Sequence, residues 1–257
     1  MAELLVWPAL LAYSEAAVAS AAEVRHPGVA GRLAIWGVRL GWLAQTALLV
    51  AQAAQADAFP WSTWAGALNL LSWLVVSVYL VWGCRASFRL LGLAVTPIAA
   101  LLLAVAWAGG GTGAEGDHPG PLLAIHVALM LAGFAAFVLA AGLAGLYLWQ
   151  ERRLKRREPT LLRLRIPPLE TLDRLESRTL YAGLVSLTLG ILVGLASLAV
   201  DGGGLDTAMV VTVAAWIVYA CYVLLRARGL RGRRAALYAV AALAAVLVVL
   251  PVTHFAG

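Results

Sequence analysis

The chain has 257 residues, of which 63% are hydrophobic and only 12% are charged. A soluble globular protein is closer to half apolar and a quarter charged, so this composition indicates an integral membrane protein. The net charge is +6, and the basic residues lie in short connections between apolar stretches. This distribution is typical of membrane topology rather than of nucleic-acid binding. The two cysteines, Cys84 and Cys221, form no Cys-x-x-Cys motif, so neither thiol-redox chemistry nor a zinc site is indicated.

Eight apolar stretches are each long enough to cross a bilayer as a helix, which takes about 20 residues. The sequence therefore predicts an all-α, polytopic membrane protein, a bundle of eight transmembrane helices forming a single integral membrane domain over residues 1–257. The expected spans are 3–22, 33–54, 65–84, 88–108, 121–149, 180–200, 207–226 and 234–252.

The basic residues predict the orientation of these spans. Eighteen of the 19 Lys and Arg residues lie in the connections after spans one, three, five and seven, whereas the alternate connections carry only acidic charges. By the positive-inside rule the basic connections are cytoplasmic, so we expect both termini to lie outside.

Spans one and two each carry one charge about 10 Å below the predicted cytoplasmic surface, Glu15 and Arg39. An unpaired charge at that depth costs on the order of 3 kcal/mol, and pairing within the bundle is the usual remedy. We therefore expect a structural Glu15–Arg39 ion pair. The alternative is that the Arg39 side chain extends to the lipid head groups.

Most of the ten tryptophans fall near the predicted ends of spans, where interfacial belts place them. Trp42, Trp73 and Trp216 lie deeper, so they are candidates for lining a pocket.

The connection before span six carries leucines at every third position from Leu169 to Leu175, opposite charged residues. This pattern predicts a short helix on the inner leaflet, with the upstream arginines on anionic head groups; a docking site for a cytoplasmic partner is the alternative. Within span six, Gly190 and Gly194 form a small-xxx-small face suited to close helix packing.

Three of the four histidines gather on the predicted outer side: His118 in a glycine-rich loop, His126 inside span five, and His254 just beyond span eight. His26 lies in a cytoplasmic connection. A polar side chain among lipid tails indicates function by default, unless the imidazole merely donates to a neighbouring helix or sits in the interface.

Two neutral imidazoles on separate helices can ligate a haem iron, so His126 and His254 are the candidate axial ligands. A glycine-rich loop holds a ligand poorly, so we do not expect His118 to take part. Met130 lies one turn deeper than His126 on the same face, where it could pack against a porphyrin or simply against another helix.

Four stretches occur in a specific order: FPWSTWAGALNLLSW (59–73), LLAIHVALMLAGFAAFVLAAGLAGLYLWQERRLK (122–155), IPPLETLDRLESRTLYAGLVSLTLGILVG (166–194) and GLRGRRAALYAV (229–240). From about residue 30 onward, the chain resembles the cytochrome c assembly membrane family, the CcsA and HemX-like proteins. The second stretch resembles the family's fifth span, where a histidine precedes a helix ending in YL..E..LK.

The resemblance implies a multi-pass protein of the bacterial cell membrane that serves cytochrome c biogenesis. It would hold b-type haem non-covalently, stably or transiently, between His126 and His254 and deliver it to apocytochrome c with a CcsB/ResB-type membrane partner. Asp206 and Trp216 keep the ten-residue separation found in the family's tryptophan-rich outer segment, so the resemblance implies that they belong to the haem site. A further alternative to the ion pair with Glu15 is that Arg39 binds a haem propionate as haem passes through from the cytoplasm. Such a protein binds and delivers haem rather than working as a conventional enzyme.

The stretch LDTAMVVTVAAWIVYA (205–220) departs from the family pattern, because Leu205 replaces the leading tryptophan and TAM replaces PKE. This departure favours the HemX-like branch, and with it a regulatory protein that affects haem or tetrapyrrole synthesis without delivering haem. A small-molecule transporter is the third hypothesis. Against it, no inverted repeat is visible, and Pro97 is the only deep helix breaker.

Overall fold

The computed structural model describes residues 2–24, 28–55, 63–83, 86–113, 120–157, 167–201 and 207–255. Within these ranges the chain forms eight α-helices and two short 3-10 helices, η1 (Ala2–Leu5) and η3 (Ala86–Leu91), and no β-strand. The prediction of an all-α protein is confirmed. A helix satisfies its backbone hydrogen bonds internally, which is what an apolar stretch needs inside a bilayer.

Five helices in the described part of the chain are long and apolar enough to cross a membrane, so the chain is a multi-pass membrane protein. They contain the stretches Val29–Ala54, Trp64–Val81, Pro121–Lys155, Leu169–Ala199 and Met209–Ala227. A further apolar helix, Gly92–Ala108, is shorter. The total of eight spans and the outward termini stay predictions.

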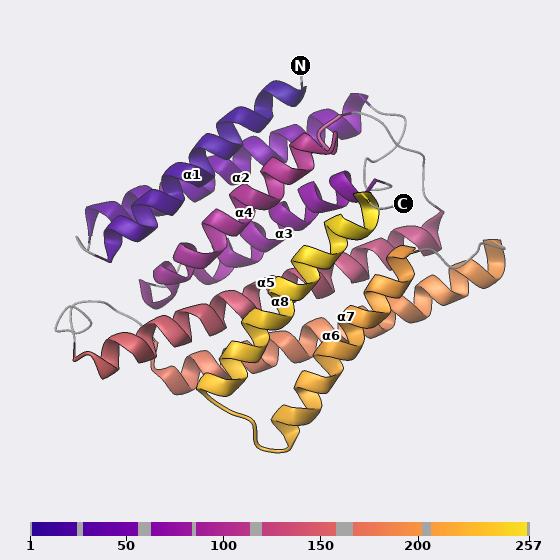
Figure 1. Ribbon diagram of the computed structural model, residues 1–257. Helices are drawn as coiled ribbons and strands as arrows, with labels where there is room; N and C mark the ends of the chain where they lie inside the picture. The colour runs from indigo at the N-terminus through magenta and orange to yellow at the C-terminus, as the bar shows by residue number, and fades with distance from the viewer. Residues whose placement is uncertain are drawn as a thin grey trace. The chain divides into compact units, whose positions relative to one another are not determined.

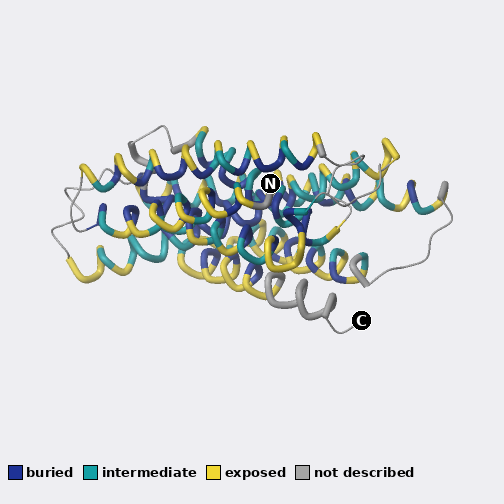
Figure 2. The backbone as a smooth tube through the Cα atoms, turned by 90° about the horizontal axis from the view of Figure 1, so that it is seen from above, coloured by how far each residue is buried: buried dark blue, intermediate teal, exposed yellow. Residues whose placement is uncertain are grey.

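Contacts between the helices group the chain into two compact units. Unit 1 comprises Met1–Pro119 and Arg153–Pro167, and unit 2 comprises Gly120–Arg152 and Pro168–Gly257. That residues 1–257 form a single membrane domain stays a prediction. Figure 2 shows buried and exposed residues alternating within each turn, so most helices have one buried and one exposed side.

Unit 1 is built from α1 (Val6–Glu23), α2 (Val29–Gln55), α3 (Trp64–Gly83) and α4 (Gly92–Ala108) (Figure 1). Helix α1 packs along α2 and α4, and α3 packs along α4. Glu23 closes the turn between α1 and α2, because its Oε2 accepts hydrogen bonds from the backbone N–H groups of Gly28 and Gly31 at 2.9 and 2.6 Å. The carboxylate thereby caps N–H groups at the start of α2 that have no partner within the helix.

A chain of buried side-chain hydrogen bonds links the helices of unit 1. The Tyr13 hydroxyl donates to Gln45 Oε1 at 2.7 Å, and Gln45 Nε2 donates to Asn69 Oδ1 at 2.9 Å. Asn69 Nδ2 donates to Gln52 Oε1 at 3.1 Å, and Gln52 Nε2 donates to the carbonyl oxygen of Gly113 at 2.7 Å. These four side chains are fully buried. Because they satisfy one another, their burial does not carry the usual desolvation cost of polar groups.

The two deep tryptophans of unit 1 pack against each other. The rings of Trp42 and Trp73 stack with centroids 5.9 Å apart. Trp42 Nε1 donates to Ser77 Oγ, and Trp73 Nε1 donates to Thr46 Oγ1, each at 2.8 Å. Both indole N–H groups are therefore bound within the helices of unit 1.

The predicted Glu15–Arg39 ion pair is wrong, because neither side chain forms an ion pair with any residue in the described ranges. The Arg39 guanidinium lies over the Trp36 ring, 5.2 Å from its centroid. The Glu15 carboxylate lies against α2 at Gly37, where an added Cβ would be 2.9 Å from Oε2. Arg39 follows Gly37 by two residues, which is about 200° around the helix, so it faces away from Glu15.

Unit 2 is built from α5 (Pro121–Lys155, except its last turn), α6 (Leu169–Asp201), α7 (Thr207–Ala227) and α8 (Arg233–Phe255) (Figure 1). Phe137 of α5 and Tyr219 of α7 stack in its core, with ring centroids 3.5 Å apart. Small side chains of α8, among them Ala235 and Ala239, fill the space beside them.

The sequence predicted that the leucines after Pro168 form a short separate helix on the inner leaflet, and this prediction is wrong. Helix α6 begins at Leu169 and continues unbroken to Asp201. Leu172 and Leu180 are both buried, because this side of the first turns packs inside the protein. A three-residue spacing suits either environment, so the sequence pattern could not separate the two.

Candidate functional site

His126 lies in the second turn of α5, half-buried against α6. Its Nδ1 is 2.7 Å from the backbone carbonyl oxygen of Gly190. A carbonyl oxygen can only accept a hydrogen bond, so Nδ1 carries the proton and donates it. In the neutral ring Nε2 is then unprotonated, and its lone pair is the one that can bind a metal.

Two glycines of α6 make room for the His126 face of α5. An added Cβ at Gly194 would lie 2.6 Å from His126 Nδ1, and one at Gly190 would lie 2.9 Å from Met130 Sδ. Both distances are shorter than the 3.4–4 Å of ordinary contact, so a larger residue would displace these side chains. The predicted small-xxx-small packing face is confirmed, and its partner is the side of α5 that carries His126 and Met130.

Met130 is partly buried and packs beside the core of unit 2. Its sulfur lies against the glycine face of α6 one turn from His126. The structure thus gives Met130 the ordinary helix-packing contact that the sequence left open as an alternative.

Trp216 is also partly buried beside this core, but it contacts α6 differently. Its Nε1 donates to Thr188 Oγ1 at 2.8 Å. Thr188 precedes Gly190 by two residues, about 200° around the helix, so it lies on nearly the opposite face of α6. The structure therefore does not bring Trp216 against His126.

Helix α8 continues to Phe255, so His254 lies in its last turn rather than beyond the helix end as expected. The His254 side chain is not among those described, and His26, His118 and Asp206 lie outside the described residues. Figure 1 shows α8 ending at the same end of unit 2 at which α5 begins. The helix directions alone therefore bring positions 126 and 254 to one end of this unit.

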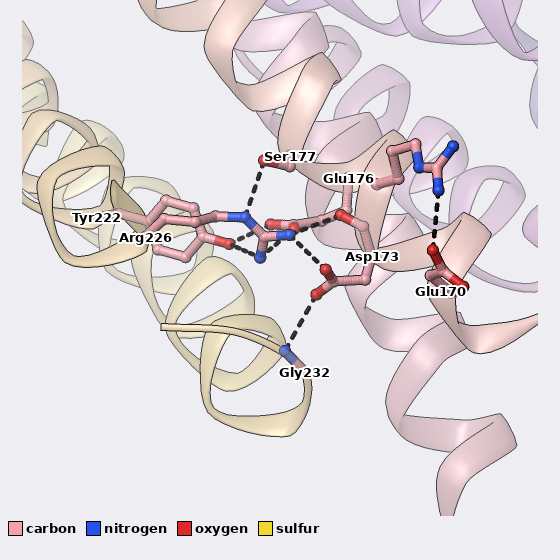
Figure 3. A network of polar contacts seen from close by, with 8 residues as sticks. Glu170, Asp173, Glu176, Ser177, Tyr222, Arg226 and Gly232 are labelled. Carbon is pink, nitrogen blue, oxygen red and sulfur yellow. Dashed lines mark hydrogen bonds and ion pairs between the residues drawn. The ribbon is translucent and has the colours of Figure 1, made fainter. Parts of the chain in front are cut away.

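A charged network that the sequence analysis missed joins α6 to α7 at the other end of unit 2 (Figure 3). Arg226 Nη2 donates to Asp173 Oδ2 at 2.7 Å, and Arg226 Nη1 lies 3.2 Å from Glu176 Oε2. The Tyr222 hydroxyl donates to Glu176 Oε1 at 2.6 Å, and Arg226 Nε donates to Ser177 Oγ at 2.8 Å. Each charge in the network is thus paired and hydrogen-bonded, as burial requires.

The sequence carried a weak signal for this network. Asp173 and Glu176 are three residues apart and Tyr222 and Arg226 four apart, so each pair lies on one helix face. From Asp173 to Gly190 is 17 residues, or about 25 Å along α6, so the network is remote from His126. Its contacts indicate a structural role, which is to hold α6 and α7 together.

These features define the class of the molecule as an all-helical, multi-pass membrane protein with a half-buried histidine at a close helix contact. The sequence profile described as "Cytochrome C assembly protein" matches residues 61–255, about three quarters of the chain. The chain therefore belongs to the cytochrome C assembly protein family. The matched range includes parts of both units.

Two of the relatives that the chain resembles carry a name from cytochrome c biogenesis. Two proteins called "Cytochrome c biogenesis protein CcsA", from Prochlorococcus marinus strains MIT 9303 and MIT 9313, are each 29% identical over 249 residues, covering 82% of this chain and 77% of their own. An "Uncharacterized 28.8 kDa protein in nifR3-like 5'region" of Azospirillum brasilense is 30% identical over 145 residues. That alignment covers 55% of this chain and spans about half, 54%, of the Azospirillum protein. No solved structure matches the chain.

Proposed function

We propose that this protein binds haem between His126 and His254 at the outer membrane surface and delivers it to apocytochrome c. Its membership of the cytochrome C assembly protein family supports a role in cytochrome c biogenesis. Haem is cargo in this proposal, held non-covalently, and its iron supplies the coordination positions that imidazole nitrogens fill.

The observation that carries the proposal is the hydrogen bond from His126 Nδ1 to the Gly190 carbonyl. Metal-binding histidines characteristically donate their second ring nitrogen to a carbonyl or carboxylate, which fixes the tautomer and the ring orientation. The same bond is what a purely structural histidine would make. It fits a ligand because it leaves Nε2 free of its proton, and because the ring is only half-buried.

His254 is the proposed second ligand. It lies in the last turn of α8, at the end of unit 2 where α5 begins, so the two histidines would approach the iron from separate helices. Met130 would border the haem from α5, and Asp206 would contribute from the residues just before α7. Trp216 lies in the middle of α7 and not against His126, so it would contribute only at the edge of the site. Because the Trp216 N–H is bound to Thr188, this residue would offer its ring rather than its N–H.

The proposed setting is the bacterial plasma membrane, with the basic connections in the cytoplasm and His126 and His254 on the outer side. The distribution of Arg and Lys supports this orientation. Delivery to apocytochrome c would need a membrane partner of the CcsB/ResB type. The two units would together form one membrane domain, which agrees with a family match that extends over both.

Absorption spectra of the purified protein test the proposal. The wild type should show a Soret band and sharp α and β bands on reduction. His126→Ala should lower the haem content or shift these bands, and added imidazole should partly restore them. A colourless wild-type protein, or unchanged spectra for both His126→Ala and His254→Ala, would contradict haem ligation by these residues.

A regulatory role in haem or tetrapyrrole synthesis is the second candidate function. The changed segment before Trp216, with Leu205 in place of a tryptophan, favours it. Loss of the gene should abolish cytochrome c maturation if the protein delivers haem. It should change tetrapyrrole levels with cytochrome c maturation intact if the protein regulates.

A further inference from the structure

The arginines at the α7–α8 end of unit 2 fall into two groups. Arg226 is almost fully buried and is neutralised by Asp173 and Glu176. Arg233 lies 4.0 Å from Glu151 in a weak, half-exposed pair. Arg228, Arg231 and Arg234 form the second group: they are exposed and make no ion pair with any residue that the structure describes. Three positive charges therefore stand uncompensated at the turn between α7 and α8, two in the turn itself and one, that of Arg234, at the start of α8.

The turn that carries them is held in one shape by backbone hydrogen bonds. The N–H of Gly229 donates to the carbonyl of Arg226, and the N–H of Leu230 donates to that of Leu225, both at 3.0 Å. This pair of bonds is the Schellman ending of a helix, and it needs the positive φ of 101° that Gly229 adopts.

The buried network fixes the same turn from the other side. The Gly232 N–H donates to Asp173 Oδ1 at 3.1 Å, while Asp173 Oδ2 accepts from Arg226 (Figure 3). One carboxylate thus ties the end of α7 and the start of α8 to α6. A turn anchored in this way presents its outward side chains from a fixed backbone, which lowers the entropic cost of binding a ligand.

A pocket of about 410 Å³ lies on this turn. Its lining combines guanidinium groups with apolar side chains: Leu225, Arg228, Gly229, Leu230, Arg231 and Arg234. A guanidinium binds phosphate oxygens through paired N–H groups and keeps its charge at all physiological pH values.

The surroundings of the pocket match those of a lipid head group. The apolar stretch of α7 ends at Ala227, immediately before Arg228. Leu224 and Leu237, one turn to either side of the arginines, are exposed at 60% and 44%. Tyr238 beside them is also exposed, as is typical of aromatic residues at a membrane interface.

We propose that Arg228, Arg231 and Arg234 form a phosphate-binding site whose ligand is the head group of an anionic phospholipid. The acyl chains would lie over the exposed leucines of α7 and α8, while the phosphate would occupy the pocket. The positive-inside bias accounts for arginines in this connection, but it requires neither a pocket nor an anchored turn. None of these three arginines belongs to the proposed haem site, so the lipid site and the haem site can be tested independently.

Native mass spectrometry of the full chain in zwitterionic detergent tests the site. Phosphatidylglycerol and phosphatidylcholine with identical acyl chains are titrated separately, and bound lipid is counted. The wild type should retain phosphatidylglycerol selectively. The pocket variant Arg228→Gln/Arg231→Gln/Arg234→Gln should bind it about 10- to 100-fold more weakly.

A second triple variant, Arg152→Gln/Arg174→Gln/Arg178→Gln, is the matched control. It removes the same charge from exposed arginines of unit 2 that lie outside the pocket. It should keep the selectivity of the wild type. Equal losses in both triple variants would reduce the effect to net charge and overturn the proposal, as would a wild type that does not distinguish the two lipids.

Inorganic phosphate, titrated alone at millimolar concentration, separates a lipid from a soluble ligand. Thermal stabilisation of the wild type by phosphate without any effect of phosphatidylglycerol would overturn the lipid assignment. If the pocket variant unfolds in detergent, the single variant Arg231→Gln, in the connection between α7 and α8, should still show reduced selectivity; wild-type selectivity there would contradict the proposal.

Discussion

Gly194→Ala probes the contact that orients His126 without altering the histidine. The new Cβ would lie 2.6 Å from Nδ1, whereas ordinary contact begins at 3.4 Å, so the ring must move by about 0.8 Å, the difference between them. The hydrogen bond from Nδ1 to the Gly190 carbonyl is 2.7 Å long. Displacement by that amount along the bond would stretch it to about 3.5 Å, where it ceases to be a hydrogen bond.

The stability cost of this substitution should be modest. Overpacking a close contact costs about 1–3 kcal/mol, and replacing a helical glycine by alanine returns up to about 1 kcal/mol. The net loss is thus about 0–3 kcal/mol, so the protein should stay folded. Haem binding should weaken about 10- to 100-fold, the usual cost of disturbing a group that orients a metal ligand.

Gly145→Ala is the matched control, because an added Cβ there meets nothing within 4 Å. It should leave haem content unchanged and raise stability by up to about 1 kcal/mol. The assay pairs thermal unfolding in detergent with the haem-to-protein ratio of each purified variant. If Gly194→Ala matched Gly145→Ala in both measurements, the proposed coupling between the glycine face of α6 and His126 would be refuted.

Three further predictions concern other parts of the chain. Arg226→Met should destabilise unit 2 by about 3–5 kcal/mol in thermal unfolding, because it leaves a buried glutamate unpaired, whereas Arg174→Met at an exposed pair should change stability by less than about 1 kcal/mol. Gln45→Leu should cost unit 1 about 1–3 kcal/mol by stranding buried polar groups, and adding Tyr13→Phe should recover part of that loss; no recovery would argue against the hydrogen bond between them. His118→Ala should keep the haem content of the wild type, because the surrounding sequence is too rich in glycine to hold a ligand; a loss equal to that of His126→Ala would identify it as a ligand instead.

Hydropathy and residue size were sufficient to predict several features of this molecule. Long apolar stretches must become helices in a bilayer, so the all-α architecture followed from composition and length alone. His126 was recognisable because no other titratable group lies in its apolar run. Gly190 and Gly194 predicted a close helix contact, since only small residues allow one.

Features that depend on how helices rotate against each other were not predictable in this way. Glu15 and Arg39 lie at matching depth but on faces that do not meet, and depth was all that the sequence provided. The hydrogen bond from Trp216 to Thr188 depends in the same manner on which side of α6 each residue occupies.

Long-range polar pairing was equally hidden in the sequence. Arg226 looked like one more basic residue of a cytoplasmic connection, whereas folding buries it between carboxylates of α6. The amide side chains of Gln45 and Asn69 likewise satisfy each other only after α2 and α3 pack. In both cases the partner is many residues away, so local spacing carries little information about it.

Electron paramagnetic resonance of the oxidised, purified protein tests the central claim most directly, because it reports the axial ligands of the haem iron. We predict the low-spin signal of iron held by two imidazoles in the wild type. That signal should be lost in His126→Ala and in His254→Ala separately. A two-imidazole signal that persists in both variants would contradict the assignment of these histidines as the haem ligands.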